Sequence, residues 1–252
     1  MPTATERAVN HWIRLALSLA AVLLVAACAP GRRSSAPDQP IGLFTSLPIL
    51  WQEAGDIRGL LNRDAPEHWA LAALRSQGEL RALNTLAGNP TPLAGLGLLV
   101  LAQPRALLPQ ENVALDDWVR RGGRVLLFAD PLLTADSHFA LGDKRRPQDV
   151  VLLSPILARW SLRLEFDEAQ PRGSRDVPLL GVVLPVNMPG RLALAGRGDR
   201  CRVLSQAIAA QCRIGRGAVL IVADAALFEA AQGDADARRD LLRVLVKDAR
   251  GD

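Results

Sequence analysis

The stretch "GGRVLLFADPLL" (residues 122–133) decides how this chain folds. An unbroken apolar run, VLLFA, stands between a pair of glycines and an Asp-Pro step. Such a run is typical of a strand covered on both faces, as in a parallel sheet. The preceding residues, 110–121, place Leu115, Trp118 and Val119 at helical spacing. A helix that leads directly into a buried strand predicts one unit of a parallel α/β sheet.

The same alternation continues on both sides of this stretch. Further elements are expected as strands at 41–44, 80–83 and 97–102 and as helices at 66–77 and 234–248. The segment "GRGAVLIVADAALF" (215–228) repeats the order of glycine, apolar strand and Ala-Asp, and it forms part of a predicted hairpin at 212–224. We therefore expect an α/β fold with a doubly wound, mostly parallel sheet, a C-terminal β-hairpin and a closing helix, in one domain over 41–252.

The N-terminal segment has the three parts of a bacterial export signal. Arg7 and Arg14 precede an uncharged apolar run at 15–27, which is shorter than the roughly 20 residues of a membrane-spanning helix. The run ends in Val-Ala-Ala-Cys, which resembles the lipobox of bacterial lipoproteins. This resemblance implies cleavage before Cys28 and lipidation of its sulfur. The expected organisation is a signal peptide at 1–27, then a flexible Pro- and Ser-rich tether at 28–40.

Such an anchor predicts a protein of the bacterial cell envelope that faces the periplasm, with membrane lipid as its partner through the acyl chains on Cys28. Ala29 after the cysteine resembles lipoproteins sent to the outer membrane, which slightly favours that membrane and leaves the inner one open. An uncleaved anchor helix and an ordinary secretory signal are the alternatives for this segment.

The net charge does not favour a nucleic-acid partner. The formal charge is +4 with a sequence pI near 9.6, but Tyr is absent and the few aromatic residues are not interleaved with basic ones. A stacking platform for bases requires such interleaving. The basic clusters at 144–146 and 197–216 are interpreted as solvated faces, with an anionic lipid or polymer surface as the alternative.

Two stretches, "LDDWVRRGGRVLLFADP" (115–131) and "GLFTSLPILW" (42–51), resemble a family of exported bacterial proteins with a domain like class I glutamine amidotransferases. Its relatives include auxiliary components of ABC transporters, such as the gliding-motility type, and domains of unknown function. The resemblance covers 41–167 and 213–227. It implies a flavodoxin- or amidotransferase-like fold, and an ABC transporter or another envelope protein as partner.

The catalytic residues of amidotransferases are missing from the matching positions. In that family a Cys nucleophile follows a central strand, whereas the strand expected at 97–102 runs into Gln103 and Pro104. We therefore expect no enzyme activity, and a non-catalytic binding or assembly module that serves a transport system. The alternative is an envelope hydrolase or a ligand sensor that uses a crevice at the carboxyl ends of the strands.

Five polar residues are expected to line that crevice. Asp130 and Asp224 follow the two repeated strands, and Thr45, Ser46 and Gln103 follow two others. The two aspartates also suit the role of helix N-caps, and capping is the favoured interpretation. No metal or cofactor is expected, because Asp130, Asp136, His138 and Asp143 lack a recognised ligand spacing.

The last prediction is a disulfide between Cys201 and Cys212. Export places both thiols where disulfides form, and they are the pair that remains once Cys28 is lipidated. The extended segments that carry them can lie side by side. Two buried free thiols are the alternative.

Overall fold

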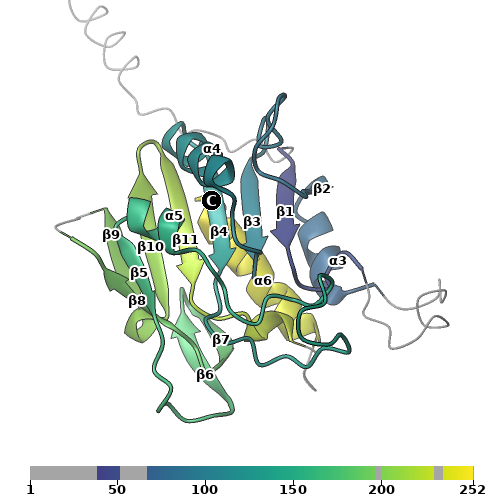
Figure 1. The fold of residues 1–252 in the computed structure, drawn as a ribbon, viewed down its shortest axis with the longest axis vertical. Coiled ribbons are helices and arrows are strands. Elements are labelled where there is room, and N and C mark those ends of the chain that lie inside the picture. The colour runs from purple at the N-terminus through teal and green to yellow at the C-terminus, as the bar shows by residue number, and fades with distance from the viewer. Residues whose placement is uncertain (1–38, 52–66, 197–199, 230–234, 252) are drawn as a thin grey trace, which may run out of the picture. The chain divides into compact units, whose positions relative to one another are not determined.

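A seven-stranded sheet forms the centre of the molecule (Figure 1). The structure is a computed structural model that describes residues 39–51, 67–196, 200–229 and 235–251. The strand order is β2-β1-β3-β4-β11-β10-β9. The bounds of these strands are Ile41–Thr45 (β1), Leu80–Ala82 (β2), Leu98–Ala102 (β3), Arg124–Phe128 (β4), Cys201–Leu204 (β9), Ala209–Ile214 (β10) and Gly217–Val222 (β11).

The sheet is mixed in direction. Strands β1, β2, β3, β4 and β11 are parallel, whereas β10 runs antiparallel to both β11 and β9. The turn between β10 and β11 is too short for a crossover, so it can join antiparallel strands only. Gly215 in this turn has φ 60°, a left-handed conformation that suits glycine.

The fold prediction is corrected on this point. The fold is α/β with a mixed sheet, and the expected doubly wound sheet of flavodoxin or amidotransferase type does not describe it. Sequence periodicity identifies a buried strand but carries no information on its direction. The C-terminal hairpin expected at 212–224 is present as β10 and β11, but periodicity does not indicate that this hairpin continues the central sheet, with β9 beyond it.

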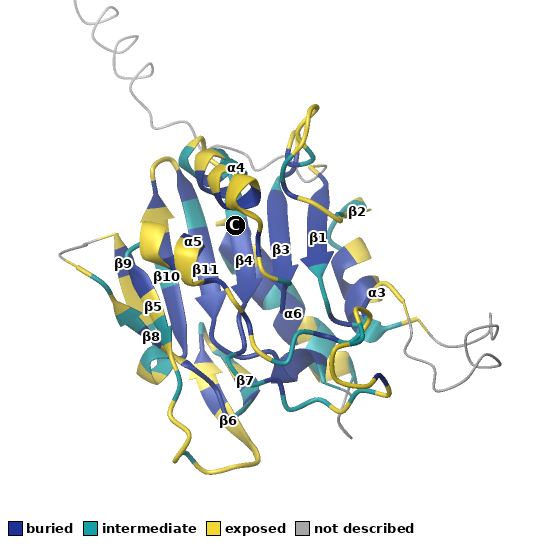
Figure 2. Cartoon of the chain, viewed as in Figure 1, coloured by how far each residue is buried: buried dark blue, intermediate teal, exposed yellow. Residues whose placement is uncertain are grey.

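Helices cover both faces of the sheet, and each face has its own core. On one face, α3 (Trp69–Arg75) and α6 (Ala235–Arg250) pack against alternate strand residues such as Leu98 and Val100. On the other, α4 (Pro109–Arg120) and α5 (Ser154–Arg159) pack against Leu99 and Leu101. Figure 2 shows the central strands as mostly buried, which agrees with their unbroken apolar sequences.

Two small antiparallel sheets complete the described part of the chain. β5 (Leu162–Glu165) pairs with β8 (Arg191–Leu194), and β6 (Ser174–Leu179) pairs with β7 (Val182–Asn187). Short 3-10 turns lie at Ser205–Ala207 (η1) and Ala226–Phe228 (η2). The β6–β7 hairpin carries Pro178 and Pro185, which a two-stranded sheet tolerates because its strands have free edges.

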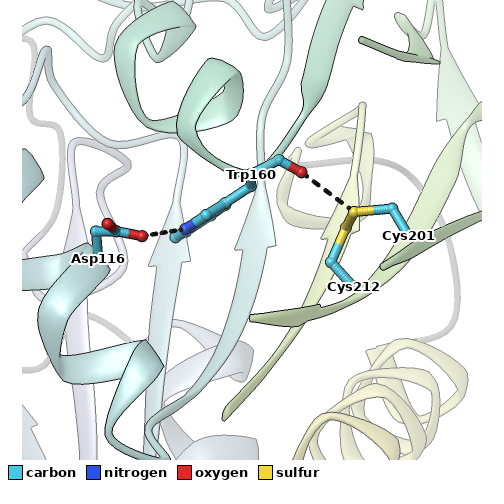
Figure 3. The surroundings of a disulfide bond; sticks show 4 residues. All are labelled: Asp116, Trp160, Cys201 and Cys212. Atoms are coloured by element: carbon cyan, nitrogen blue, oxygen red, sulfur yellow. Dashed lines mark hydrogen bonds between the residues drawn. A yellow bond between two sulfur atoms is a disulfide. The ribbon is translucent and has the colours of Figure 1, made fainter. Parts of the chain in front are cut away.

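The disulfide suggested by the sequence is present in the structure. Cys201 and Cys212 lie directly opposite each other on β9 and β10, with their Cα atoms 4.0 Å apart. Sγ of Cys201 lies 3.3 Å from the backbone oxygen of Trp160, whose indole Nε1 donates a hydrogen bond to Asp116 (Figure 3). The bridge therefore joins the two outer strands of the sheet beside the α4–α5 core.

The predicted signal peptide, and with it Cys28, lies outside the described residues, as does all but the end of the predicted tether. Among the helices of the described part, none has the length and apolar character needed to cross a membrane.

Candidate functional site

Two acidic residues meet where the central strands β4 and β11 end. Asp130 lies two residues beyond β4, and Asp224 lies two residues beyond β11. The two strands are parallel neighbours with Phe128 opposite Val222, so their carboxyl ends lie at the same edge of the sheet. Both acids are buried, with 0% and 2% of their surfaces exposed. Buried carboxyl groups require hydrogen-bond partners or a proton.

Each carboxyl group holds one local turn and one distant segment. Asp130 Oδ1 accepts a hydrogen bond from the backbone N–H of Leu132 (2.9 Å), and its Oδ2 accepts from Ala225 (3.1 Å). Asp224 Oδ1 accepts from Ala226 (2.6 Å), and its Oδ2 accepts from Asn187 at the end of β7 (2.9 Å). The bonds two residues along the chain are Asx-type turns, which asparagine and aspartate favour after strands. The two aspartates, which the sequence favours as helix N-caps, therefore stabilise turns in the structure.

Burial raises the pKa of both acids. For Asp130 the pKa rises to about 7, because loss of solvent and the charge of Glu229 outweigh the two backbone N–H donors. For Asp224 burial again has the largest effect, and the neighbouring charge of Asp130 raises the pKa further. Two carboxyl groups that disfavour each other's ionisation hold a proton near neutral pH.

A polar network covers the pair. Thr134 Oγ1 donates to Glu229 Oε1 (2.6 Å), and Asn187 Nδ2 donates to Thr134 Oγ1 (2.8 Å). The chain then continues as residues 187–190, here called the cover segment, and the backbone N–H of Gly190 donates to the oxygen of Ala223 (2.7 Å). The cover segment therefore binds Asp224 and the residue before it, just beyond the end of β11.

A cavity of about 380 Å³ lies against the cover segment. Pro189 and Gly190 form part of its wall, and charged side chains from Asp167, Arg175 and Arg191 line the rest together with Gln170, Gln206 and Ile208. Gln170 Nε2 also donates to the backbone oxygen of Pro189 (3.0 Å). The cover segment is thus in contact with the buried acid pair through Asn187 and with this cavity through Pro189 and Gly190.

The other three residues of the predicted crevice bind main chain, and among them Gln103 reaches the pair through the backbone of Asp130. Gln103 is fully buried, accepts from the backbone N–H of Asp130 (2.8 Å) and donates to its backbone oxygen (3.0 Å). Thr45 Oγ1 donates to the oxygen of Ala102 (2.7 Å), and Ser46 Oγ donates to that of Gln103 (2.5 Å). These side chains fix the strand ends, and their polar atoms are not directed at the carboxyl groups.

Sequence reasoning missed Glu229, Thr134 and Asn187. They lie near the pair only through the folded arrangement, since Thr134 and Glu229 are 95 residues apart. No local pattern marks them. Within the described ranges, no group of three or more acidic, His or Cys residues is placed to hold a metal ion.

Comparison with known proteins gives structural likeness without sequence relatives. No protein-family model and no curated protein matches this sequence. An exo-beta-1,4-mannosidase from Opitutaceae bacterium strain TAV5 is 11% identical (TM-score 0.46), with 84% of this chain and 34% of that chain covered. A beta-galactosidase from Bacillus circulans sp. alkalophilus is also 11% identical (TM-score 0.47), with 84% and 31% covered. The chain thus spans about a third of these glycosidase chains.

A cytoplasmic protein from Salmonella typhimurium LT2 matches over nearly its whole length. It is 10% identical with a TM-score of 0.50, and the match covers 83% of this chain and 99% of that protein. At this identity the likeness concerns the fold alone.

These comparisons correct the family prediction and what followed from it. The matching structures named above are glycosidases and a cytoplasmic protein, not amidotransferases or transporter components. The assignment to amidotransferase-like transporter auxiliaries of the gliding-motility type is therefore wrong. The non-catalytic assembly role and the expected lack of enzyme activity depended on it, and both are withdrawn. The two stretches on which that assignment rests consist of apolar runs and turns, and many α/β sheets share such patterns.

Proposed function

We propose that this protein is a hydrolase in which Asp130 and Asp224 act together as general acid and general base. One observation carries the proposal: two buried carboxyl groups lie at the ends of neighbouring parallel strands, and burial raises the pKa of Asp130 to about 7. Strongly perturbed carboxyl groups are characteristic of acid–base sites. Ligands of open α/β sheets bind at the carboxyl ends of the strands.

The pair can supply and accept a proton in one cycle. Near neutral pH it carries one proton, because ionisation of both groups would place two negative charges beside Glu229 in a buried site. The protonated carboxyl group gives its proton to the leaving-group oxygen as the bond to that oxygen breaks. The ionised carboxyl group takes a proton from the attacking water, whose oxygen forms the new bond. The proton count of the pair is unchanged after the cycle.

Substrate access requires movement of the cover segment. Asn187 bonds to Asp224 and Gly190 bonds to Ala223, so these two hydrogen bonds must open before a substrate can touch the carboxyl groups. Opening of short segments over active sites is a common step that sets turnover rates. The 380 Å³ cavity adjoins this segment, and its Arg175 and Arg191 offer hydrogen-bond donors to a polar substrate.

The proposal is tested on the full chain with chromogenic glycosides and esters between pH 5 and 8. Replacing a general acid or base lowers kcat/KM by about 100-fold or more, which is the expected result for Asp130→Asn and Asp224→Asn. Asp176→Asn, the same change at an exposed strand position, serves as the matched control. Unchanged activity in both site variants would show that the pair is structural. A substrate that raises Tm without being turned over would favour a ligand sensor.

A further inference from the structure

Four arginines line a groove at the opposite edge of the sheet from the acid pair, and one of them, Arg120, is paired with Asp116. The groove has a volume of about 720 Å³ and lies along β9, β10 and the start of β11, next to the end of α6. Arg200, Arg202 and Arg213 are exposed on its wall. We call these three residues the arginine cluster. The inference drawn from it does not depend on the proposed hydrolase.

The arginine cluster places like charges across two strands. The backbone N–H of Arg213 donates to the oxygen of Arg200 (2.7 Å), one step beyond the Cys201–Cys212 pair in the same antiparallel register. Residues directly opposite in such a pair project from the same face of the sheet. Like charges in this position destabilise a sheet unless an anion lies between them.

No acid in the described part of the chain neutralises the cluster. None of its three arginines forms an ion pair there, whereas Arg105, Arg120 and Arg159 all bind carboxylates. Asp248 lines the groove, but its Oδ2 accepts from Gln211 Nε2 (2.7 Å), and Gln211 Oε1 accepts from Arg202 (2.8 Å). The guanidinium groups of Arg200 and Arg213 are thus available to an external anion.

We propose that the arginine cluster binds the phosphate group of an anionic phospholipid headgroup. Guanidinium groups recognise phosphate through paired hydrogen bonds, and several together bind a surface of the opposite charge. A membrane is the favoured source of phosphate because the described chain begins at the same edge of the sheet. Figure 1 shows the start of β1 and the β10–β11 turn at that edge.

The predicted anchor can reach from this edge to a membrane. Cys28 precedes Gln39 by eleven residues, and a chain of that length spans at most about 40 Å. Five strand spacings separate β1 from β9, which is roughly 24 Å. A membrane that holds the acyl chains of Cys28 is therefore within reach of the arginine cluster.

The test compares vesicles of phosphatidylglycerol with vesicles of phosphatidylcholine, using the full chain. Contributions of the apolar N-terminal segment are common to both vesicles, so the difference in bound fraction reports headgroup charge. The variant is Arg200→Gln with Arg213→Gln, and the control with the same loss of charge is Lys144→Gln with Arg172→Gln, at exposed positions elsewhere. The site variant should bind phosphatidylglycerol at least about tenfold more weakly, while the control stays within about twofold.

Folding and ligand source are checked in the same series. Because Arg200 and Arg213 repel each other, the site variant should keep or gain thermal stability at low salt, whereas a structural role would lower it. Equal binding to both vesicles, or an equal loss in the control, overturns the proposal. Saturable binding of inorganic pyrophosphate without preference for phosphatidylglycerol also overturns the lipid assignment and identifies a site for soluble phosphate.

Discussion

Asp130 and Ala225 are joined by a hydrogen bond of 3.1 Å from the backbone N–H of Ala225 to Oδ2 of Asp130. The two residues follow β4 and β11 and are 95 positions apart in sequence, so this bond connects the ends of the two strands. The carboxyl group of Asp130, which accepts this bond, is fully buried. The same side chain therefore fixes the strand ends and acquires the proton affinity on which the proposed chemistry depends.

The first prediction is that Asp130 makes stability fall as the pH rises. Burial raises its pKa from 3.8 to about 7, so the folded protein holds this proton more tightly than the unfolded chain. The contribution is complete below pH 3.8 and is lost as the pH rises through 7, on the order of 4 kcal/mol. Urea unfolding measures the free energy of unfolding at pH 4.5 and at pH 8. The difference between the two values should be smaller for Asp130→Asn than for the unchanged protein.

Two other groups, Glu111 and His68, also have shifted pKa values that make stability depend on pH. Interactions with Arg105 and backbone donors lower the pKa of Glu111 to about 2, so its contribution is lost below pH 4.5, outside the measured range. Burial lowers the pKa of His68, which opposes Asp130 because the neutral imidazole is favoured as the pH rises. Both groups are present in the unchanged protein and in Asp130→Asn, so their contributions cancel when the two proteins are compared. Equal pH dependence in the two proteins would contradict the raised pKa of Asp130.

The second prediction concerns Asp116, which holds α4 to α5. Its Oδ1 accepts from the indole Nε1 of Trp160 (3.1 Å), and its Oδ2 accepts from Arg120 (2.9 Å) and Arg159 (3.0 Å). Removing one partner of a buried ionic network costs about 3 kcal/mol or more. Asp116→Asn should therefore lower the free energy of unfolding by about that amount. Asp117→Asn, at the exposed neighbouring position, should change it by less than about 0.5 kcal/mol.

The third prediction concerns the Cys201–Cys212 bridge. The two cysteines are 11 residues apart, and closing a loop of this length stabilises a protein by about 3 kcal/mol through the entropy of the unfolded chain. Reduction should lower the free energy of unfolding by about that much. The variant Cys201→Ala with Cys212→Ala should be insensitive to reductant. Two alkylated cysteines in the non-reduced protein would contradict the bridge.

The positions of the central strands could be predicted because their sequences are unusual. The strand Leu98–Ala102 lies within the strand expected at 97–102, and residues 125–128 of β4 lie within the apolar run VLLFA. The burial of nearly every residue in both strands explains the missing alternation. Asp130 and Asp224 could likewise be placed at strand ends from their position after such runs. These inferences need only neighbouring residues.

The rest of the site depends on contacts between distant segments. Asn187 binds Asp224 from a hairpin with two prolines, and the sequence around it predicts only broken strands. The sequence places Gln103 in the crevice, whereas in the structure its side chain bonds to the main chain of Asp130. The local sequence shows that a polar side chain follows a strand, but it does not show which group that side chain will hydrogen-bond. The mistaken family assignment had the same origin, because its patterns were local and apolar.

The fourth prediction is that Cys28 carries the lipid anchor. The sequence before it resembles a lipobox, so Cys28→Ser should leave the precursor uncleaved and should abolish metabolic labelling with palmitate. A variant with Ala29→Gly provides the control, because the small residue after the cysteine is retained. Labelling that persists in Cys28→Ser would refute the anchor.

The last prediction tests whether the cover segment controls the acid pair. A Cβ atom at Gly190 would lie 2.6 Å from Leu164 Cδ1 and 2.9 Å from Pro131 Cγ, which is closer than such atoms approach. Gly190→Ala should push the segment away from the strand ends, weaken the Asn187–Asp224 bond, and cost about 1–3 kcal/mol of stability. Water then reaches the carboxyl groups, so the raised pKa of Asp130 should fall and the loss of stability between pH 4.5 and 8 should shrink. Gly88→Ala is the control, because the added Cβ meets its nearest atom at an ordinary 3.5 Å. An unchanged pH dependence in Gly190→Ala, with stability reduced, would show that the segment packs against the site without governing its access to water.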